Sequence, residues 1–207
     1  MSRAVFFDLN GTLVSPIKVD RLSELRMVDG AAAAVARLSA AGFVCPVVTV
    51  QGRIAKGFFS LEEFQGWFTM LADRFREHGA EIVGPYVCPH RFREPCHCKK
   101  PNTFLYEQAA ADHGIDLGRS FLIGDSAADV EAASRFGGRG CLVRTGWAAD
   151  EREVQRAMPY ASHVARSVGD AATWILRQPE STERRHRPLT TVRVRAAPGT
   201  TSVRGHP

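Results

Sequence analysis

The 207-residue sequence contains no run of about 18 uncharged apolar residues, so no segment is expected to span a membrane. Its beginning also lacks the basic and apolar regions of a secretory signal, because strand-like residues start at once, which favours the cytoplasm. Cysteine is scarce, with five in the chain, and three of them lie within residues 88–98. That clustering predicts a metal site rather than a disulfide framework.

An excess of charge is missing from most of the chain, although the net charge is +5. Seven arginines and two glutamates lie from Arg177 onward. The remaining 20 basic and 20 acidic side chains, in residues 1–176, cancel. Nucleic acid is therefore not expected to bind this neutral part of the chain.

The sequence does have a regular alternation of strand-like and helix-like segments. Strands are expected at residues 4–7, 43–50, 80–87, 121–123, 141–143 and 163–165. Helices are expected after the first four strands and after the last one, the final two at residues 127–136 and 169–177. This alternation predicts an α/β fold with a parallel, doubly wound sheet. We expect one domain over residues 1–177, with no separate cap domain in the short segment 15–28.

Three helix starts can be predicted from local signals. Asp29 is expected to cap an alanine-rich helix that ends at Gly42. Ser60 with Glu63 forms a capping-box pattern ahead of a helix to about residue 78. Asn102 is expected to cap a helix that continues to about residue 113.

Residues 178–207 are rich in Arg, Pro, Ser and Thr and lack apolar periodicity, so we expect a disordered tail. Residues 192–195 alternate as an edge strand would, but four residues are weak evidence for one. The arginines also leave open a different function, in which the tail tracks the phosphates of a polynucleotide substrate.

Asp8 stands where the first strand ends, directly before the turn signal Asn10-Gly11. The carboxyl end of a buried strand is where an open α/β sheet places its chemistry. The alternative is an Asx turn, in which Asp8 bonds only its own backbone.

Further polar groups follow later strands or the cysteine cluster. They are Thr49, Lys99-Lys100-Pro101 and Gly124-Asp125-Ser126-Ala127-Ala128-Asp129. Together with residues 8–12 they resemble, in order, the four signature motifs of the haloacid dehalogenase-like phosphohydrolases, over roughly residues 4–177. The resemblance implies a Rossmann-like fold and a phosphatase that works through an aspartyl-phosphate.

The resemblance also implies a role for each matched residue. Asp8 would be the nucleophile, and Mg²⁺ would bind Asp8, the backbone carbonyl of Asn10, and Asp125. Phosphate oxygens would be held by Thr49 and Lys100, with Asp129 steadying Lys100 or a metal-bound water. The alternatives are that Asp125 and Asp129 cap a helix and that Lys100 is an ordinary exposed lysine.

Asn10 departs from the family pattern, which has a second Asp at this position as general acid and base. An amide cannot donate and reclaim a proton, and the loss of such a group lowers rates by typically ~10²–10⁴-fold. We therefore expect metal binding with impaired turnover, unless the leaving group is good, as in an anomeric or acyl phosphate.

The pattern Cys88-Pro89-His90, then Cys96-His97-Cys98, supplies three thiolates and an imidazole, enough for a closed structural zinc site. His97 is an alternative to His90, which the family resemblance favours. Cys45 and Cys141 lie in apolar strands and are expected to be core thiols.

The zinc loop and residues 49–57 resemble a capless branch of the family that includes phosphatases of heptose bisphosphate and of histidinol phosphate. This implies substrate contacts from Thr49, Gln51, Gly52, Lys99 and Lys100. Val50, Gly52 and Lys99 differ from the branch pattern, which bears on the substrate more than on the fold. We expect a monomeric phosphatase of a small phosphorylated, sugar-like metabolite, or alternatively a catalytically degenerate protein that binds a phosphate ligand.

Overall fold

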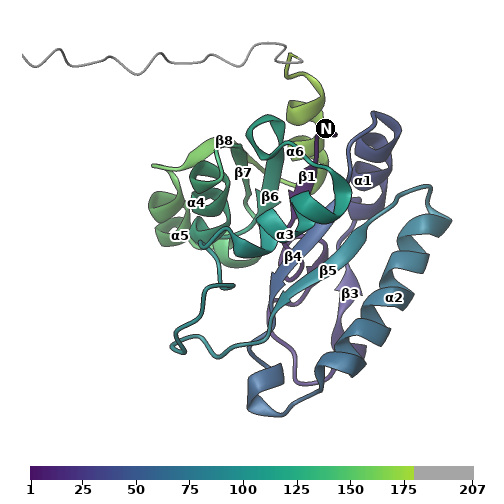
Figure 1. Ribbon diagram of the computed structural model, residues 1–207, viewed down its shortest axis with the longest axis vertical. Coiled ribbons are helices and arrows are strands. Elements are labelled where there is room, and N and C mark those ends of the chain that lie inside the picture. The colour runs from purple at the N-terminus through teal and green to yellow at the C-terminus, as the bar shows by residue number, and fades with distance from the viewer. Residues whose placement is uncertain (180–207) are drawn as a thin grey trace, which may run out of the picture.

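The computed structural model describes residues 1–179 (Figure 1). The disordered tail and the edge strand expected beyond residue 179 lie outside the described residues. No helix within residues 1–179 is both long and apolar enough to cross a membrane.

A six-stranded parallel sheet forms the centre of the fold, in the order β5-β4-β1-β6-β7-β8. The strands are β1 (Val5–Phe7), β4 (Pro46–Val50), β5 (Val83–Cys88), β6 (Phe121–Gly124), β7 (Arg139–Val143) and β8 (Ala161–Ala165). The chain starts in the middle of the sheet and builds outward on both sides of β1. Such a reversal opens a crevice at the carboxyl ends of the strands that flank it.

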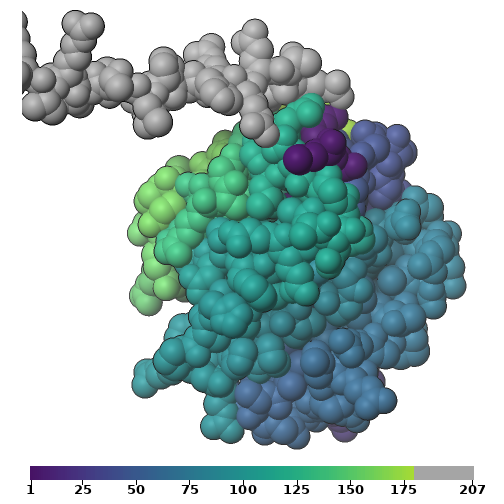
Figure 2. All heavy atoms as spheres, viewed as in Figure 1, coloured from purple at the N-terminus to yellow at the C-terminus, as the bar shows by residue number. Residues whose placement is uncertain are grey.

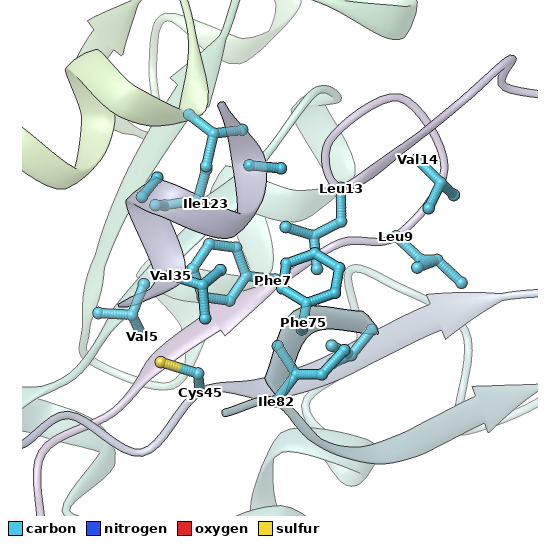
Figure 3. Close-up of a cluster of buried hydrophobic side chains, with 14 of the residues drawn as sticks. Val5, Phe7, Leu9, Leu13, Val14, Val35, Cys45, Phe75, Ile82 and Ile123 are labelled. Atoms are coloured by element: carbon cyan, nitrogen blue, oxygen red, sulfur yellow. The ribbon is translucent and has the colours of Figure 1, made fainter. Parts of the chain in front are cut away.

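Helices cover both faces of this sheet (Figure 1). They are α1 (Ala31–Ala40), α2 (Leu61–Glu77), α3 (Phe104–His113), α4 (Ala127–Arg135), α5 (Glu151–Ala157) and α6 (Val168–Leu176). Alternate residues of β1 serve the two faces, because successive strand side chains point in opposite directions. Phe7 packs with side chains from α1, α2 and α6, and Phe6 packs with side chains from α3 and α4. Figure 3 shows Phe7 and Phe75 among the apolar side chains on the Phe7 face of the sheet.

The segment between β1 and α1 forms a small antiparallel pair, β2 (Val14–Ser15) with β3 (Arg26–Met27), and a 3₁₀ turn, η1 (Leu22–Glu24). This agrees with the expected absence of a cap domain. Other short helices are η2 (Ile54–Lys56), η3 (Leu117–Arg119) and η4 (Gly146–Ala149).

Two of the three predicted helix caps are wrong. Gly30, with φ of 76°, is the N-cap of α1, so the position is fixed by a backbone conformation that suits glycine and not by the Asp29 side chain. Thr103 is the N-cap of α3, and the Asn102 amide instead donates to the Cys96 carbonyl at 3.1 Å. The Ser60–Glu63 capping box is present at the start of α2.

Phe64 tests the packing of α2 against the sheet. Its side chain is fully buried and packs against Phe59 and Trp67. We expect Phe64→Ala to lower the free energy of unfolding by about 3–5 kcal/mol, through lost burial and the cavity left behind. Urea unfolding measures the change, and Phe92→Ala, at a residue that is 87% exposed, is the matched control with almost no effect. Equal effects of the two substitutions would contradict this packing.

Candidate active site

Four polar side chains meet at the carboxyl edge of the sheet. Asp8 directly follows β1, Thr49 lies near the end of β4, and Asp125 directly follows β6. Lys100 reaches them from the segment between β5 and α3. The structure therefore brings together the strand ends that the sequence marked as functional.

Lys100 is the centre of this group. Its Nζ donates to Asp8 Oδ1 at 2.5 Å and to Asp129 Oδ1 at 2.7 Å. The side chains of Lys100, Asp8 and Asp129 are only 5%, 13% and 1% exposed. Lys100 is thus no ordinary exposed lysine, because a buried ammonium needs carboxylate partners to remain charged.

Asp129 both bonds Lys100 and takes part in the N-terminal cap of α4. Its Oδ1 binds Lys100, while Oδ2 accepts hydrogen bonds from the Ser126 backbone N–H at 3.1 Å and the Ser126 hydroxyl at 2.5 Å. Gly124 leaves room for it, since a Cβ at Gly124 would collide with the Asp129 side chain. The helix start therefore fixes the direction of the carboxylate that steadies Lys100.

Asp125 lies in a pocket formed by two glycines. A Cβ on either Gly11 or Gly146 would overlap its Oδ2 atom, and both glycines have positive φ values. The Trp147 backbone N–H donates to that same oxygen at 2.7 Å. One carboxylate oxygen is thereby fixed, and the other remains available for a further ligand.

Three carboxyl groups of the site lie close together beside one ammonium. Asp8, Asp125 and Asp129 each place a carboxylate oxygen within 4.8 Å of the others, with one ammonium between them. Burial, followed by the neighbouring carboxylates Asp8 and Asp129, raises the pKa of Asp125 to about 9. Burial also raises the pKa of Asp8 to about 6, although Lys100 opposes the shift. Oxygen ligands of this kind suit Mg²⁺.

Lys100 stays charged within this group. Burial alone would lower the pKa of its ammonium, but Asp129 and Asp8 raise that pKa well above its ordinary value. Lys100 therefore keeps a positive charge beside the Asp8 carboxylate.

Gln51 connects two of the predicted site residues. Its Nε2 group donates to Asn10 Oδ1 at 2.7 Å and to Thr49 Oγ1 at 3.0 Å. Gln51 is 6% exposed, and its backbone N–H donates to the Cys88 carbonyl at 2.8 Å. Gln51 thus ties the loop after β1 and the end of β4 through its side chain, and the end of β5 through its backbone.

The predicted zinc ligands form one cluster. Cys88, His90, Cys96 and Cys98 bring one ligand atom each within 4.8 Å of the others. The two Sγ atoms of Cys88 and Cys96 are 3.7 Å apart. A tetrahedral site with zinc–sulfur bonds of ~2.3 Å requires sulfur atoms ~3.8 Å apart, so the spacing suits zinc. His90 contributes Nδ1, whereas the His97 ring lies outside the cluster, edge-on to Phe104.

Part of the loop between β5 and α3 projects from the body of the molecule (Figure 1), and Arg91 in this loop contacts the segment that follows β4 (Figure 2). Arg91 donates through Nε and Nη2 to the Ala55 carbonyl at 3.1 and 3.0 Å. Gly52 faces the His90 carbonyl so closely that a Cβ would lie 3.2 Å from it. The cysteine loop and the Gln51 loop therefore support each other.

The structure does not bring Lys99 to the carboxylates. Its ammonium donates to the carbonyls of Arg91, Phe92 and Glu94, at 2.5, 2.8 and 2.8 Å. These three bonds use all the donors of a lysine, so this side chain closes the cysteine loop on itself. The substrate contact that the family resemblance implies for Lys99 stays a prediction.

Several contributors had no sequence signal. The Trp147 N–H fixes Asp125, and the Thr145 hydroxyl donates to the Gly11 carbonyl at 2.6 Å. A groove of about 590 Å³ is lined in part by Gly11, Lys18 and Trp147. The Lys18 Nζ lies 4.5 Å from the centre of the Trp147 ring. These contacts depend on the approach of segments far apart in the chain.

Comparisons with known proteins agree on one family. A family model described as HAD-hydrolase-like matches residues 97–171, which include Lys100, Asp125 and Asp129. D-glycero-beta-D-manno-heptose-1,7-bisphosphate 7-phosphatase of Haemophilus ducreyi is 33% identical over 155 residues, covering 70% of this chain and 84% of that protein. The D-glycero-D-manno-heptose-1,7-bisphosphate 7-phosphatase of Thermosynechococcus vestitus is 31% identical, with 83% and 94% covered.

A solved structure has the same fold. The D,D-heptose 1,7-bisphosphate phosphatase from B. bronchiseptica, complexed with magnesium and phosphate, superposes with a TM-score of 0.76. It is 24% identical and covers 84% of this chain and 98% of its own.

His90 and His97 form a matched pair for testing the cysteine cluster. We expect His90→Ala to lose bound zinc, because within residues 1–179 the His90 imidazole is the one that lies with the three thiols. His97→Ala should keep one zinc ion per chain. Zinc content by elemental analysis, together with the thermal midpoint, checks both. Equal zinc loss in the two variants would contradict this ligand assignment.

Asp125 offers a test of whether the three carboxylates bind a cation. In Mg²⁺-free buffer its folded pKa of about 9 lies above the ordinary 3.8, so folding takes up a proton and stability falls as pH rises between those values. Asp125→Asn lacks this penalty and should melt at least about 5 °C higher at about pH 8.

Mg²⁺ should raise the melting temperature of the wild type and leave that of Asp125→Asn unchanged, as followed by scanning fluorimetry. Asp73→Asn, at an exposed helix position, is the control and should respond like the wild type. An equal response of all three proteins would show that Asp125 takes no part in cation binding.

Proposed function

The chain belongs to the haloacid dehalogenase-like hydrolases, and from this premise we propose that it is a Mg²⁺-dependent phosphatase acting through an aspartyl-phosphate on Asp8. The observation that carries the proposal is the buried Lys100 ammonium bonded to both Asp8 and Asp129, with Asp125 beside them. A nucleophilic carboxylate is kept next to a fixed positive charge, which is what phosphoryl transfer needs most.

In the first step the Asp8 carboxylate attacks phosphorus, and the bond between phosphorus and the leaving oxygen breaks. Lys100 and the Thr49 hydroxyl hold the other phosphate oxygens and offset their charge. In the second step water attacks the same phosphorus, and the bond to Asp8 breaks, which releases phosphate and restores the carboxylate.

Asp8, the backbone carbonyl of Asn10, and Asp125 would hold Mg²⁺, an ion that prefers oxygen ligands. Bound there, Mg²⁺ supplies positive charge that lowers the repulsion between a phosphate dianion and a carboxylate nucleophile. The raised pKa of Asp125 supports this assignment, because three carboxylates with one ammonium leave negative charge uncompensated.

We propose a phosphomonoester of a small, sugar-like metabolite of the heptose-bisphosphate type as the substrate. The names of the relatives support this, since the chain covers 84% and 94% of the lengths of two of them. The short β2–β3 segment in place of a cap domain leaves the site open. The substrate contacts of this chain would differ from the branch pattern at Val50, Gly52 and Lys99. The Lys99 ammonium bonds carbonyls of its own loop.

We assign a structural role to zinc in the cysteine cluster. Four protein ligands would complete a tetrahedral site and leave no open position for chemistry. A zinc site needs reduced cysteines, and the cytoplasm keeps cysteines reduced, so we propose the cytoplasm as the location.

A second function, binding of an intact phosphate ester without turnover, is favoured by Asn10 alone. Its amide cannot move protons, whereas the groups proposed to hold phosphate and metal do not depend on proton transfer. The two functions differ in one outcome: turnover with phosphate release, or tight binding of the unreacted ester.

Replacing Asn10 distinguishes them. We expect Asn10→Asp to hydrolyse sugar phosphates ~10²-fold faster than the wild type or more, because it restores a general acid and base. Phosphate release on a panel of sugar mono- and bisphosphates measures this.

Asp8→Asn in the Asn10→Asp background is the control and should abolish turnover. If Asn10→Asp is no faster on any ester, the general-acid account of position 10 is wrong. If neither the wild type nor Asn10→Asp releases phosphate but both bind the esters, ligand binding is the function and the phosphatase proposal is wrong.

A further inference from the structure

We infer that Gln51 is a positioning residue, whose amide turns Asn10 and Thr49 into hydrogen-bond donors aimed at the phosphoryl group. The inference rests on the phosphatase function proposed above. The supporting contacts are the two hydrogen bonds from Gln51 Nε2, to Asn10 Oδ1 at 2.7 Å and to Thr49 Oγ1 at 3.0 Å. One donor group therefore occupies an acceptor oxygen on each neighbour.

The two neighbours are left with their donors unengaged. Because Asn10 Oδ1 accepts from Gln51, its planar amide directs Nδ2 the other way, and no residue within 1–179 accepts a hydrogen bond from that nitrogen. Because Thr49 Oγ1 accepts from Gln51, its own hydrogen is available to a different acceptor. An oxyanion is the partner that suits two such donors.

The opposite polarity would disfavour an anion. If Gln51 accepted from both residues, Asn10 would turn its carbonyl oxygen and Thr49 its lone pairs toward the phosphate. Oxygen lone pairs facing a dianion repel it, whereas N–H and O–H dipoles attract it. The donor arrangement is therefore the one that a phosphate-binding site stabilises.

The cysteine loop fixes Gln51 in place. The Gln51 backbone N–H donates to the Cys88 carbonyl at 2.8 Å, and Gly52 packs directly against the His90 carbonyl. Both partners are residues of the proposed zinc cluster, so the direction of the Gln51 amide is set by an ordered loop.

A fixed amide donor at position 10 selects a class of substrate. Asn10 Nδ2 can hydrogen-bond the leaving oxygen but cannot give it a proton, so that oxygen departs as an anion. Esters whose leaving group is a weak base, such as anomeric and acyl phosphates, react well under this constraint, and simple alkyl phosphates react poorly.

The test uses zinc-loaded, full-length protein with Mg²⁺ and a series of substituted phenyl phosphates. Gln51→Met, which keeps the length and removes the donor, should lower kcat/KM about ten-fold. In an Asn10→Ala/Thr49→Val background the same substitution should change kcat/KM less than about two-fold, because nothing remains to be oriented. Gln51→Glu, whose carboxylate only accepts, should lose more than Gln51→Met.

Binding of inorganic phosphate in the presence of Mg²⁺, measured by calorimetry, repeats the cycle without turnover. The same ten-fold and two-fold effects are expected on Kd, with zinc content and thermal midpoint showing that each variant folds. An equal loss from Gln51→Met in both backgrounds, or wild-type activity in Gln51→Glu, overturns the inference. If the wild type cleaves no aryl phosphate, the proposed function fails, and the phosphate-binding cycle still decides the role of Gln51.

Discussion

One buried ammonium, that of Lys100, is the interaction on which the rest of the site depends. It joins the carboxylate that follows β1 to the carboxylate in the first turn of α4. Removing one partner of such a buried group is costly, about 3–5 kcal/mol, because it leaves an uncompensated charge. Neighbouring features are shaped to allow this contact: Gly124 leaves space for Asp129, and Ser126 orients it.

The cysteine loop brings Lys100 to this position without an apolar core of its own. Cys98 lies two residues before Lys100, and Cys88 ends β5 beside the Gln51 backbone. A metal bound by four side chains can replace packing in a loop, since its binding energy becomes folding energy. The same loop therefore supports Lys100 and, through Gln51, both Thr49 and Asn10. The proposed zinc would in this way stabilise the site without contacting it.

Sequence was sufficient where the determining contacts are local or follow from strand order. The Ser60–Glu63 capping box spans four residues and is present. The placing of Asp8 and Asp125 at one edge follows from parallel strands, whose carboxyl ends meet. The cluster of Cys88, His90, Cys96 and Cys98 likewise follows from ligand chemistry and short spacing.

Sequence was insufficient where a distant partner decides. Asn102 has the composition of a helix cap, but the folded loop offers it the Cys96 carbonyl. Lys99 and Lys100 are adjacent and chemically alike, yet one closes the loop and the other enters the site. Helix α5 and the two-residue strands β2 and β3 were not predicted, because they are too short for a clear periodicity. The roles of the site residues and the monomeric state stay predictions.

The central claim is that Asp8, Thr49, Lys100 and Asp125 surround one phosphoryl group. Its most direct test is a crystal structure of the protein soaked with Mg²⁺ and tungstate, a phosphate mimic located by its anomalous scattering. The account predicts tungstate beside Asp8, within hydrogen-bond distance of Lys100 Nζ and Thr49 Oγ1, with Mg²⁺ on Asp125. Tungstate bound at another place, with Lys100 still bonded only to its two carboxylates, would contradict it.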